Sequence, residues 1–137
     1  MENRLLVDSC AWIALYDKND KQHSKAVKLF GELSKKQSKI VLHSLVLVEM
    51  LSILKYHKHD LKDIENIRLS VTGAGNIDLA KTDVFDLDLK MWRLFESKNK
   101  LGLVDTVLLD YCLKNKIVLA TFDKELEEIW NKLKREN

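Results

Sequence analysis

The sequence predicts an α/β fold in which helices cover both faces of a central parallel sheet. Short apolar runs of strand length alternate along the chain with longer segments whose apolar residues recur at helical spacing. The chain has no proline and four glycines, which favours regular elements over long loops. Because its 137 residues include no repeat, low-complexity segment or flexible linker, we expect one domain that spans residues 1–137.

The order of strands and helices follows from these runs and from the residues that begin or end them. The expected strands are Leu5–Asp8, Ile40–His43, Ile77–Ala80 and Ile117–Phe122. The expected helices are Ser9–Tyr16, Gln22–Lys36, Ser44–Tyr56, Asp60–Thr72, Val84–Ser97, Val104–Asn115 and Lys124–Lys134. Asp8 or Ser9, Ser44 and Asp60 can each accept a hydrogen bond from a free N–H group at a helix start, and Gly73 suits a helix end.

Two acidic residues are expected where strands end. Asp8 closes the apolar run 5–7, and Asp123 follows the run 117–122. Ligand sites in open parallel sheets form at the carboxyl ends of the strands. Both side chains are therefore candidates for one ligand site.

Two further acids lie in predicted helices. Glu49 lies inside the apolar segment 45–54, so we expect it to be buried and to need a cation or a hydrogen-bond donor. Asp105 begins a helix and shares a face with apolar residues, so we expect it to point inward. Asp110 shares a polar face with Thr106 and Lys114, so we expect it to point outward.

Each of the four acids also has a purely structural interpretation. Asp8, Asp105 and Asp123 can cap helices, and Glu49 can form a buried ion pair with a lysine or an arginine. The joint occurrence of all four favours a shared site. Four carboxylates without a matched set of cysteines and histidines suit a hard cation such as Mg²⁺ or Mn²⁺ better than zinc.

Composition and motifs exclude several classes of protein. The net charge of +2 is too small to indicate a nucleic-acid partner, and no apolar run approaches the roughly 20 residues of a membrane span. Cys10 and Cys112 lie in apolar segments, which indicates reduced core cysteines in a cytoplasmic protein. The sequence lacks the dinucleotide fingerprint, the phosphate-binding loop and the GxSxG motif of serine hydrolases.

Four motifs occur in the order and approximate spacing of PIN-domain proteins. They are Val7-Asp8-Ser9, Val48-Glu49, Gly102-Leu103-Val104-Asp105-Thr106-Val107-Leu108-Leu109 and Leu119-Ala120-Thr121-Phe122-Asp123. From Leu5 to Asp123 the chain resembles PIN-domain ribonucleases, and among them the compact toxins of the VapC type. The resemblance implies a three-layer α/β/α domain whose parallel sheet has four or five strands, although residues 125–137 are expected to form a helix and no fifth strand.

The resemblance also implies an activity and a set of partners. The implied catalytic and metal-binding residues are Asp8, Glu49, Asp105 and Asp123. They would bind Mg²⁺ or Mn²⁺, with hydroxyl support from Ser9 and Thr121, for hydrolysis of RNA phosphodiesters. The implied partners are RNA, a cognate antitoxin protein of a toxin-antitoxin system, and a second copy of the chain in a homodimer.

Two other functions are alternatives. A non-catalytic PIN-like module that binds RNA or protein would be marked by loss of the acids, and all four are present. A phosphoacceptor receiver domain is disfavoured because the first strand ends in Asp8 followed by Ser9, without an acidic pair.

The candidate residues for RNA binding are the lysines at positions 35, 36, 39, 55, 58, 98, 100, 114 and 116 and the aromatic residues Trp12, Tyr56 and Trp92.

Overall fold

The computed structural model describes residues 3–57 and 59–136, and it confirms the α/β fold with a central parallel sheet. The strands are β1 (Arg4–Val7), β2 (Lys39–His43), β3 (Ile77–Ala80) and β4 (Val118–Ala120). They are hydrogen-bonded in the order β3-β2-β1-β4, and every pair is parallel. The described residues form these four strands and no fifth. Lys58, one of the lysines considered for RNA binding, lies outside the described residues.

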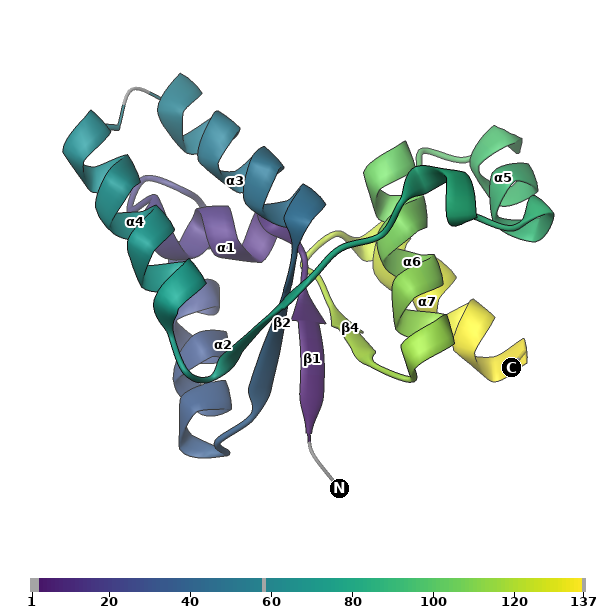
Figure 1. Ribbon diagram of the computed structural model, residues 1–137, viewed down its shortest axis with the longest axis horizontal. Coiled ribbons are helices and arrows are strands. Elements are labelled where there is room, and N and C mark those ends of the chain that lie inside the picture. Colours follow the sequence, from purple (N-terminus) through teal and green to yellow (C-terminus); the bar gives the residue numbers. More distant parts are fainter. Residues whose placement is uncertain (1–2, 58, 137) are drawn as a thin grey trace.

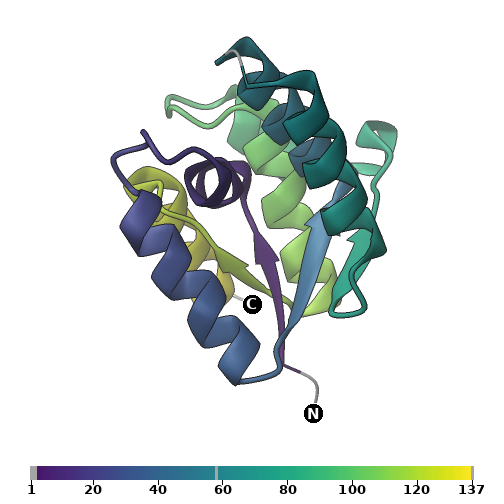
Figure 2. The same cartoon turned by 90° about the vertical axis from the view of Figure 1, so that its left-hand side faces the viewer.

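Helices cover both faces of the sheet, which gives the expected three layers (Figure 1). One layer consists of α1 (Ser9–Tyr16), α2 (His23–Lys35), α3 (Ser44–Tyr56) and α4 (Leu61–Gly73), and Figure 2 views the molecule from this side. The other layer consists of α5 (Leu89–Glu96), α6 (Leu103–Asn115) and α7 (Lys124–Glu136). None of the described helices is long and apolar enough to cross a membrane.

The single helix expected over 84–97 is wrong, because the structure divides this segment. A short 3-10 helix, η1 (Val84–Asp86), is followed by two non-helical residues before α5 begins. Asp88 has extended backbone geometry, and its carboxylate accepts a hydrogen bond from Met91 N–H at 3.0 Å. This is an N-cap, and it begins a new helix where apolar spacing alone predicted continuity.

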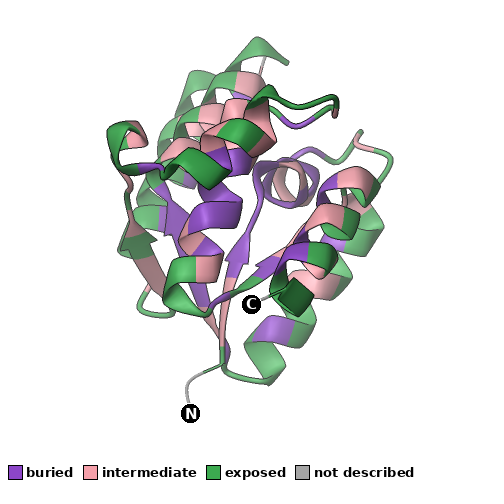
Figure 3. Ribbon diagram, turned by 90° about the vertical axis from the view of Figure 1, so that its right-hand side faces the viewer, coloured by how far each residue is buried: buried purple, intermediate pink, exposed green. Residues whose placement is uncertain are grey.

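The core fills both interfaces between the sheet and the helices. Val7, Val41 and Leu42 on the central strands are buried, as are Met50 of α3 and Leu109 of α6. Figure 3 shows buried residues on the strands and on the helix surfaces that face them. A parallel sheet covered on both faces needs apolar side chains on both, so its strands are continuous apolar runs. The sheet is a rigid support for the polar residues that follow the strands.

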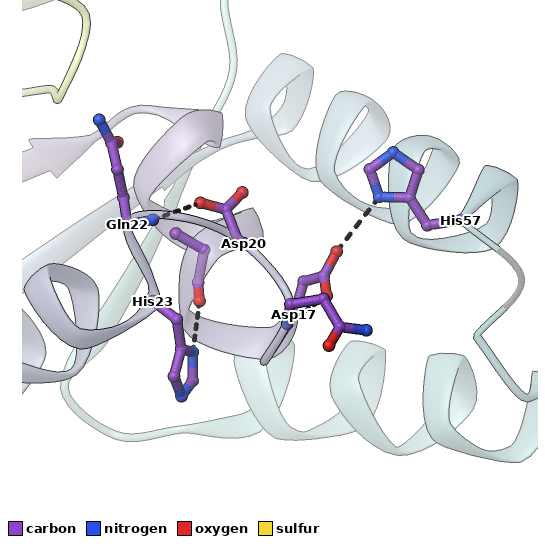
Figure 4. Close-up of polar contacts among 7 residues, drawn as sticks. Asp17, Asp20, Gln22, His23 and His57 are labelled. Carbon is purple, nitrogen blue, oxygen red and sulfur yellow. Dashed lines mark hydrogen bonds and ion pairs between the residues drawn. The ribbon is translucent and has the colours of Figure 1, made fainter.

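The turn between α1 and α2 is held by hydrogen bonds that reach α3 (Figure 4). Asp17, after the last residue of α1, accepts from His57 Nδ1 at 3.3 Å, and Asp20 accepts from Gln22 N–H at 2.8 Å. His23 begins α2 one residue later than expected, and its Nδ1–H donates to a carbonyl of α1 at 2.7 Å. The C-terminal end of helix α1 is therefore tied to both α2 and α3.

Candidate active site

The structure brings all four sequence-predicted acids to one cavity of about 380 Å³, here called the acidic cavity. Asp8 lies between β1 and α1, Glu49 on α3, Asp105 in the first turn of α6, and Asp123 between β4 and α7. Parallel neighbouring strands end at the same edge of the sheet, which explains why Asp8 and Asp123 meet. Cys10 and Gly102 also line the acidic cavity, although the sequence indicated no role at a site for Cys10 and included Gly102 only as part of a motif.

Asp8 is the most deeply buried of the four, with 5% of its surface exposed. Its Oδ1 accepts from Cys10 N–H at 2.8 Å, so the expected N-cap of α1 is present. Its Oδ2 accepts from the Thr121 hydroxyl at 2.6 Å, and its N–H donates to the Ala120 carbonyl at 3.0 Å. Capping and a place on the acidic cavity are therefore compatible for this carboxylate.

Ser9 connects Asp8 to Glu49. Its hydroxyl donates to Glu49 Oε1 in a short contact and lies 3.4 Å from Asp8 Oδ1. A hydroxyl group has one proton, so it can satisfy only one of these carboxylates at a time. Two acids that share a single donor leave negative charge that a cation could neutralise.

Glu49 is half-buried, so the expectation that it is buried is wrong. Its neighbour Val48 is exposed, because this part of α3 is not covered by the sheet or by another helix on that side. Among residues 3–57 and 59–136, Glu49 forms no ion pair with a lysine or arginine. The alternative of a structural ion pair therefore has no partner within the described chain.

Thr121 connects Asp8 to Asp123 at the other end of the site. While its hydroxyl donates to Asp8, the same oxygen accepts from Asp123 N–H at 3.0 Å. Asp123 is exposed, and its Oδ1 accepts from Leu126 N–H at 3.1 Å, which is the expected cap on α7.

The Cys10 sulfur lies 3.7 Å from the Thr121 hydroxyl oxygen. Burial and the charge of Asp8 raise the pKa of Cys10 to about 11, so its thiol stays protonated.

Asp105 is half-buried, and its Oδ2 accepts from Gly102 N–H at 3.2 Å. Gly102 holds the N-cap position of α6, so Asp105 satisfies a free N–H group from inside the first turn. Burial, with smaller contributions from the negative charges of Asp8, Asp123 and Glu49, raises the pKa of Asp105 from 3.8 to about 6, although the hydrogen bond from Gly102 N–H acts in the opposite direction. Burial and like charge both disfavour the ionised form of a carboxylate, which explains the direction of this shift.

The raised pKa of Asp105 predicts how stability depends on pH. Between pH 3.8 and about 6 the folded protein holds a proton on Asp105 that the unfolded chain has released. The free energy of unfolding should therefore fall as pH rises through this window. Urea denaturation in EDTA at several pH values should show a larger fall for the parent protein than for Asp105→Asn. Identical pH profiles for the two proteins would contradict the shift.

The donor chemistry of the acidic cavity fits a hard divalent cation, because all four acids offer oxygen atoms. Their arrangement is not a complete coordination shell. Within the described ranges, no group of three or more Asp, Glu, His or Cys side chains is arranged to hold a metal ion. Several of the carboxylate oxygens instead accept from helix N–H groups, as described above.

The expectation that Asp110 points outward is wrong. It is 3% exposed, and its Oδ2 lies 2.9 Å from Lys114 Nζ. Helix α6 contacts β4, α5 and α7, so residues around most of its circumference are buried, including its polar face. Asp110 does not line the acidic cavity but a second one.

Comparison with known proteins identifies the family. The model of the PIN domain family matches residues 5–131, and the chain belongs to this family. Among solved structures, the chain is similar to VapC20 of Mycobacterium tuberculosis, a toxin that cleaves the sarcin-ricin loop. The TM-score is 0.75 at 18% sequence identity, and the match covers 91% of this chain and 94% of VapC20. A search of curated protein sequences finds no match.

Proposed function

We propose that the protein is a metal-dependent endoribonuclease that hydrolyses RNA phosphodiesters and acts as the toxin of a toxin-antitoxin pair. The observation that carries the proposal is the convergence of Asp8, Glu49, Asp105 and Asp123 on one cavity without a described basic partner. Membership of the PIN family and likeness to VapC20 support a nuclease. The proposed cofactor is Mg²⁺ or Mn²⁺, held by these four carboxylates.

The residues of the acidic cavity have separate roles in the proposal. A bound Mg²⁺ would supply an activated water and neutralise charge at the scissile phosphate. Thr121 fixes Asp8 through one carboxylate oxygen while Cys10 N–H fixes the other. The Ser9 hydroxyl orients Glu49, and Gly102 N–H orients Asp105. These contacts hold the acids in place before substrate binds, which is what a hydrolytic metal site requires.

A cleavage assay tests the proposal. The purified full chain, freed of any bound protein, is incubated with RNA hairpins that carry single-stranded loops, in Mg²⁺, Mn²⁺ or EDTA. With either ion we expect cuts in the loops and products that carry a 5′-phosphate. In EDTA we expect no cuts. Equal cleavage in EDTA would reject the metal-dependent nuclease.

The proposal includes a cytoplasmic homodimer that binds an antitoxin and works as one domain. Cys10 and Cys112 form no disulfide, consistent with a reducing compartment. Val48, Tyr56 and Leu61 are large apolar residues of α3 and α4 that remain exposed, so these helices are candidates for the dimer surface. Sedimentation at micromolar concentration should show a dimer, and a monomer at every accessible concentration would count against it.

A non-catalytic PIN-like module is the alternative function. It is favoured by one observation, the lack of an arranged metal-binding group among the described residues. Calorimetry with Mn²⁺ separates the two functions, because a module that has lost catalysis has no need of a cation at these acids. Of the aromatic candidates for RNA stacking, Trp12 is excluded because it is buried, whereas Tyr56 is exposed.

A further inference from the structure

A second cavity, of about 730 Å³, is lined by residues of the segment that follows β3 and of the second half of α6. Figure 1 shows the course of these two segments. The cavity is here called the α6 cavity, and its lining includes Lys81, Thr82, Asp110, Tyr111, Lys114 and Asn115. None of the four acids of the proposed active site lines it. Its volume lies in the range of pockets that bind small organic groups, about 300–1,000 Å³.

Asp110 is a buried acceptor in the lining of the α6 cavity. Only 5% of its side chain is exposed, and one oxygen, Oδ2, is paired with Lys114 Nζ. This contact raises the pKa of Lys114, so its ammonium group is charged at neutral pH. The other oxygen, Oδ1, forms no hydrogen bond with the rest of the described chain. Oδ1 is not one of the fully buried polar atoms that lack a partner in the described chain, so it is open to the cavity and can accept a hydrogen bond from an N–H group of a ligand.

Thr82 presents a hydroxyl proton to the same cavity. Burial lowers the pKa of His43, which is therefore neutral and has one N–H group. Since Leu45 N–H donates to His43 Nδ1 at 3.1 Å, the ring proton lies on Nε2 and is donated to Thr82 Oγ1 at 2.9 Å. The proton of the Thr82 hydroxyl has no acceptor among residues 3–57 and 59–136. The direction of this chain of hydrogen bonds makes Thr82 a donor toward the cavity.

The remaining lining adds an aromatic ring, an acceptor, a cation and the exposed carboxylates of Asp83 and Asp86. The Tyr111 ring is held edge-on against His43, with centroids 5.5 Å apart. Asn115 Nδ2 donates to the Tyr111 carbonyl at 2.9 Å, which leaves its side-chain oxygen as a further acceptor. Lys81 is exposed at the rim. Fixed donors and acceptors next to an aromatic ring suit an unpaired nucleobase, which proteins recognise by edge hydrogen bonds and stacking.

We propose that the α6 cavity binds one unpaired base of an RNA strand and so determines the sequence at which the RNA is cut. Asp110 Oδ1 accepts from a base N–H group, the Thr82 hydroxyl donates to a ring nitrogen or carbonyl oxygen, and Lys81 contacts the backbone phosphate. The inference rests on the proposed function, which supplies RNA as the ligand. Asp110 lies about 7.5 Å along α6 from Asp105 and about 140° around the helix axis, so an RNA strand must cross the surface of α6 to reach both cavities.

Binding of single nucleotides tests this site separately from cleavage. The full chain carrying Asp105→Asn is labelled with ¹⁵N and titrated with each of the four nucleoside 5′-monophosphates, and with Mg²⁺ alone. We expect one base to shift the amide resonances of Thr82, Asp110 and Tyr111 more strongly than the others. Adding Thr82→Val, which removes the hydroxyl at similar volume, should weaken that binding roughly 3- to 10-fold. The matched control is Thr72→Val in α4, an exposed residue outside the cavity.

Each outcome decides the inference. Base-selective shifts that Thr82→Val weakens support it, even if no RNA is cut, and in that case the nuclease is rejected while the base site stands. Equal affinity for all four nucleotides, unchanged by Thr82→Val, would mean that only phosphate is bound and would overturn base recognition. Shifts caused by Mg²⁺ and by no nucleotide would identify a cation site at Asp83, Asp86 and Asp110, and they would also overturn base recognition. No shift with any nucleotide rejects the site.

Discussion

Replacing Asp105 or Asp8 with asparagine is expected to reduce metal-dependent RNA cleavage at least about 100-fold. Even the replacement of a residue that only orients a metal ligand lowers metal affinity or activity about 10- to 100-fold. Asparagine removes the charge and keeps the volume. It can also cap a helix, so the hydrogen bond from Cys10 N–H to residue 8 is retained in Asp8→Asn. Both variants should fold, and calorimetry should show weaker Mn²⁺ binding.

The matched control is Asp88→Asn, which makes the same chemical change at the N-cap of α5. Asp88 does not line the acidic cavity, so this variant should cleave RNA like the parent protein. If Asp8→Asn and Asp105→Asn bind Mn²⁺ as tightly as the parent, the assignment of the metal ligands is wrong. A contaminating ribonuclease would be recognised because its activity would be the same in all three variants.

Glu49→Gln should separate activity from stability. Glutamine preserves volume and can still accept from the Ser9 hydroxyl through its amide oxygen, but it removes one of four converging negative charges. We expect a loss of cleavage of at least about 100-fold, as for the other ligands. In EDTA the free energy of unfolding should be unchanged or higher. Thermal denaturation with and without Mn²⁺, alongside the cleavage assay, measures both effects.

The opposite result would support a structural role for Glu49. Removing one partner of a buried ion pair costs about 3–5 kcal/mol, so a loss of that size in EDTA would point to a basic partner of Glu49. Glu96→Gln at the end of α5 is a suitable control, because this residue lies outside the acidic cavity. It should change neither the activity nor the stability of the protein.

Local patterns predicted most of the fold. The four strands occur where apolar runs are flanked by capping residues, and strand boundaries differ from expectation by a few residues at most. The segment 84–97 was predicted wrongly because its apolar spacing continues through Asp88, while the capping carboxylate interrupts the helix. Spacing describes which face is buried, and it does not report where the backbone leaves the helix.

Burial was harder to predict on the helices. Asp110 and Glu49 were expected on opposite sides of the boundary between core and solvent, yet Asp110 is buried and Glu49 is half-buried. The burial of each residue depends on which segments from elsewhere in the chain pack against its helix. Helix α6 is enclosed by β4, α5 and α7, whereas Glu49, near the middle of α3, lies at the acidic cavity.

The sequence by itself determined the α/β class, the order of elements and the four acids that converge, because strand ends and helix starts are encoded by neighbouring residues. Only the tertiary structure decided which acids Thr121 and Ser9 connect, that Asp105 has a raised pKa, and that Asp110 and Thr82 share a second cavity. These properties depend on distances between segments up to 113 positions apart, as for Thr121 and Asp8. Desolvation and charge coupling arise from such distances, and no local pattern contains them.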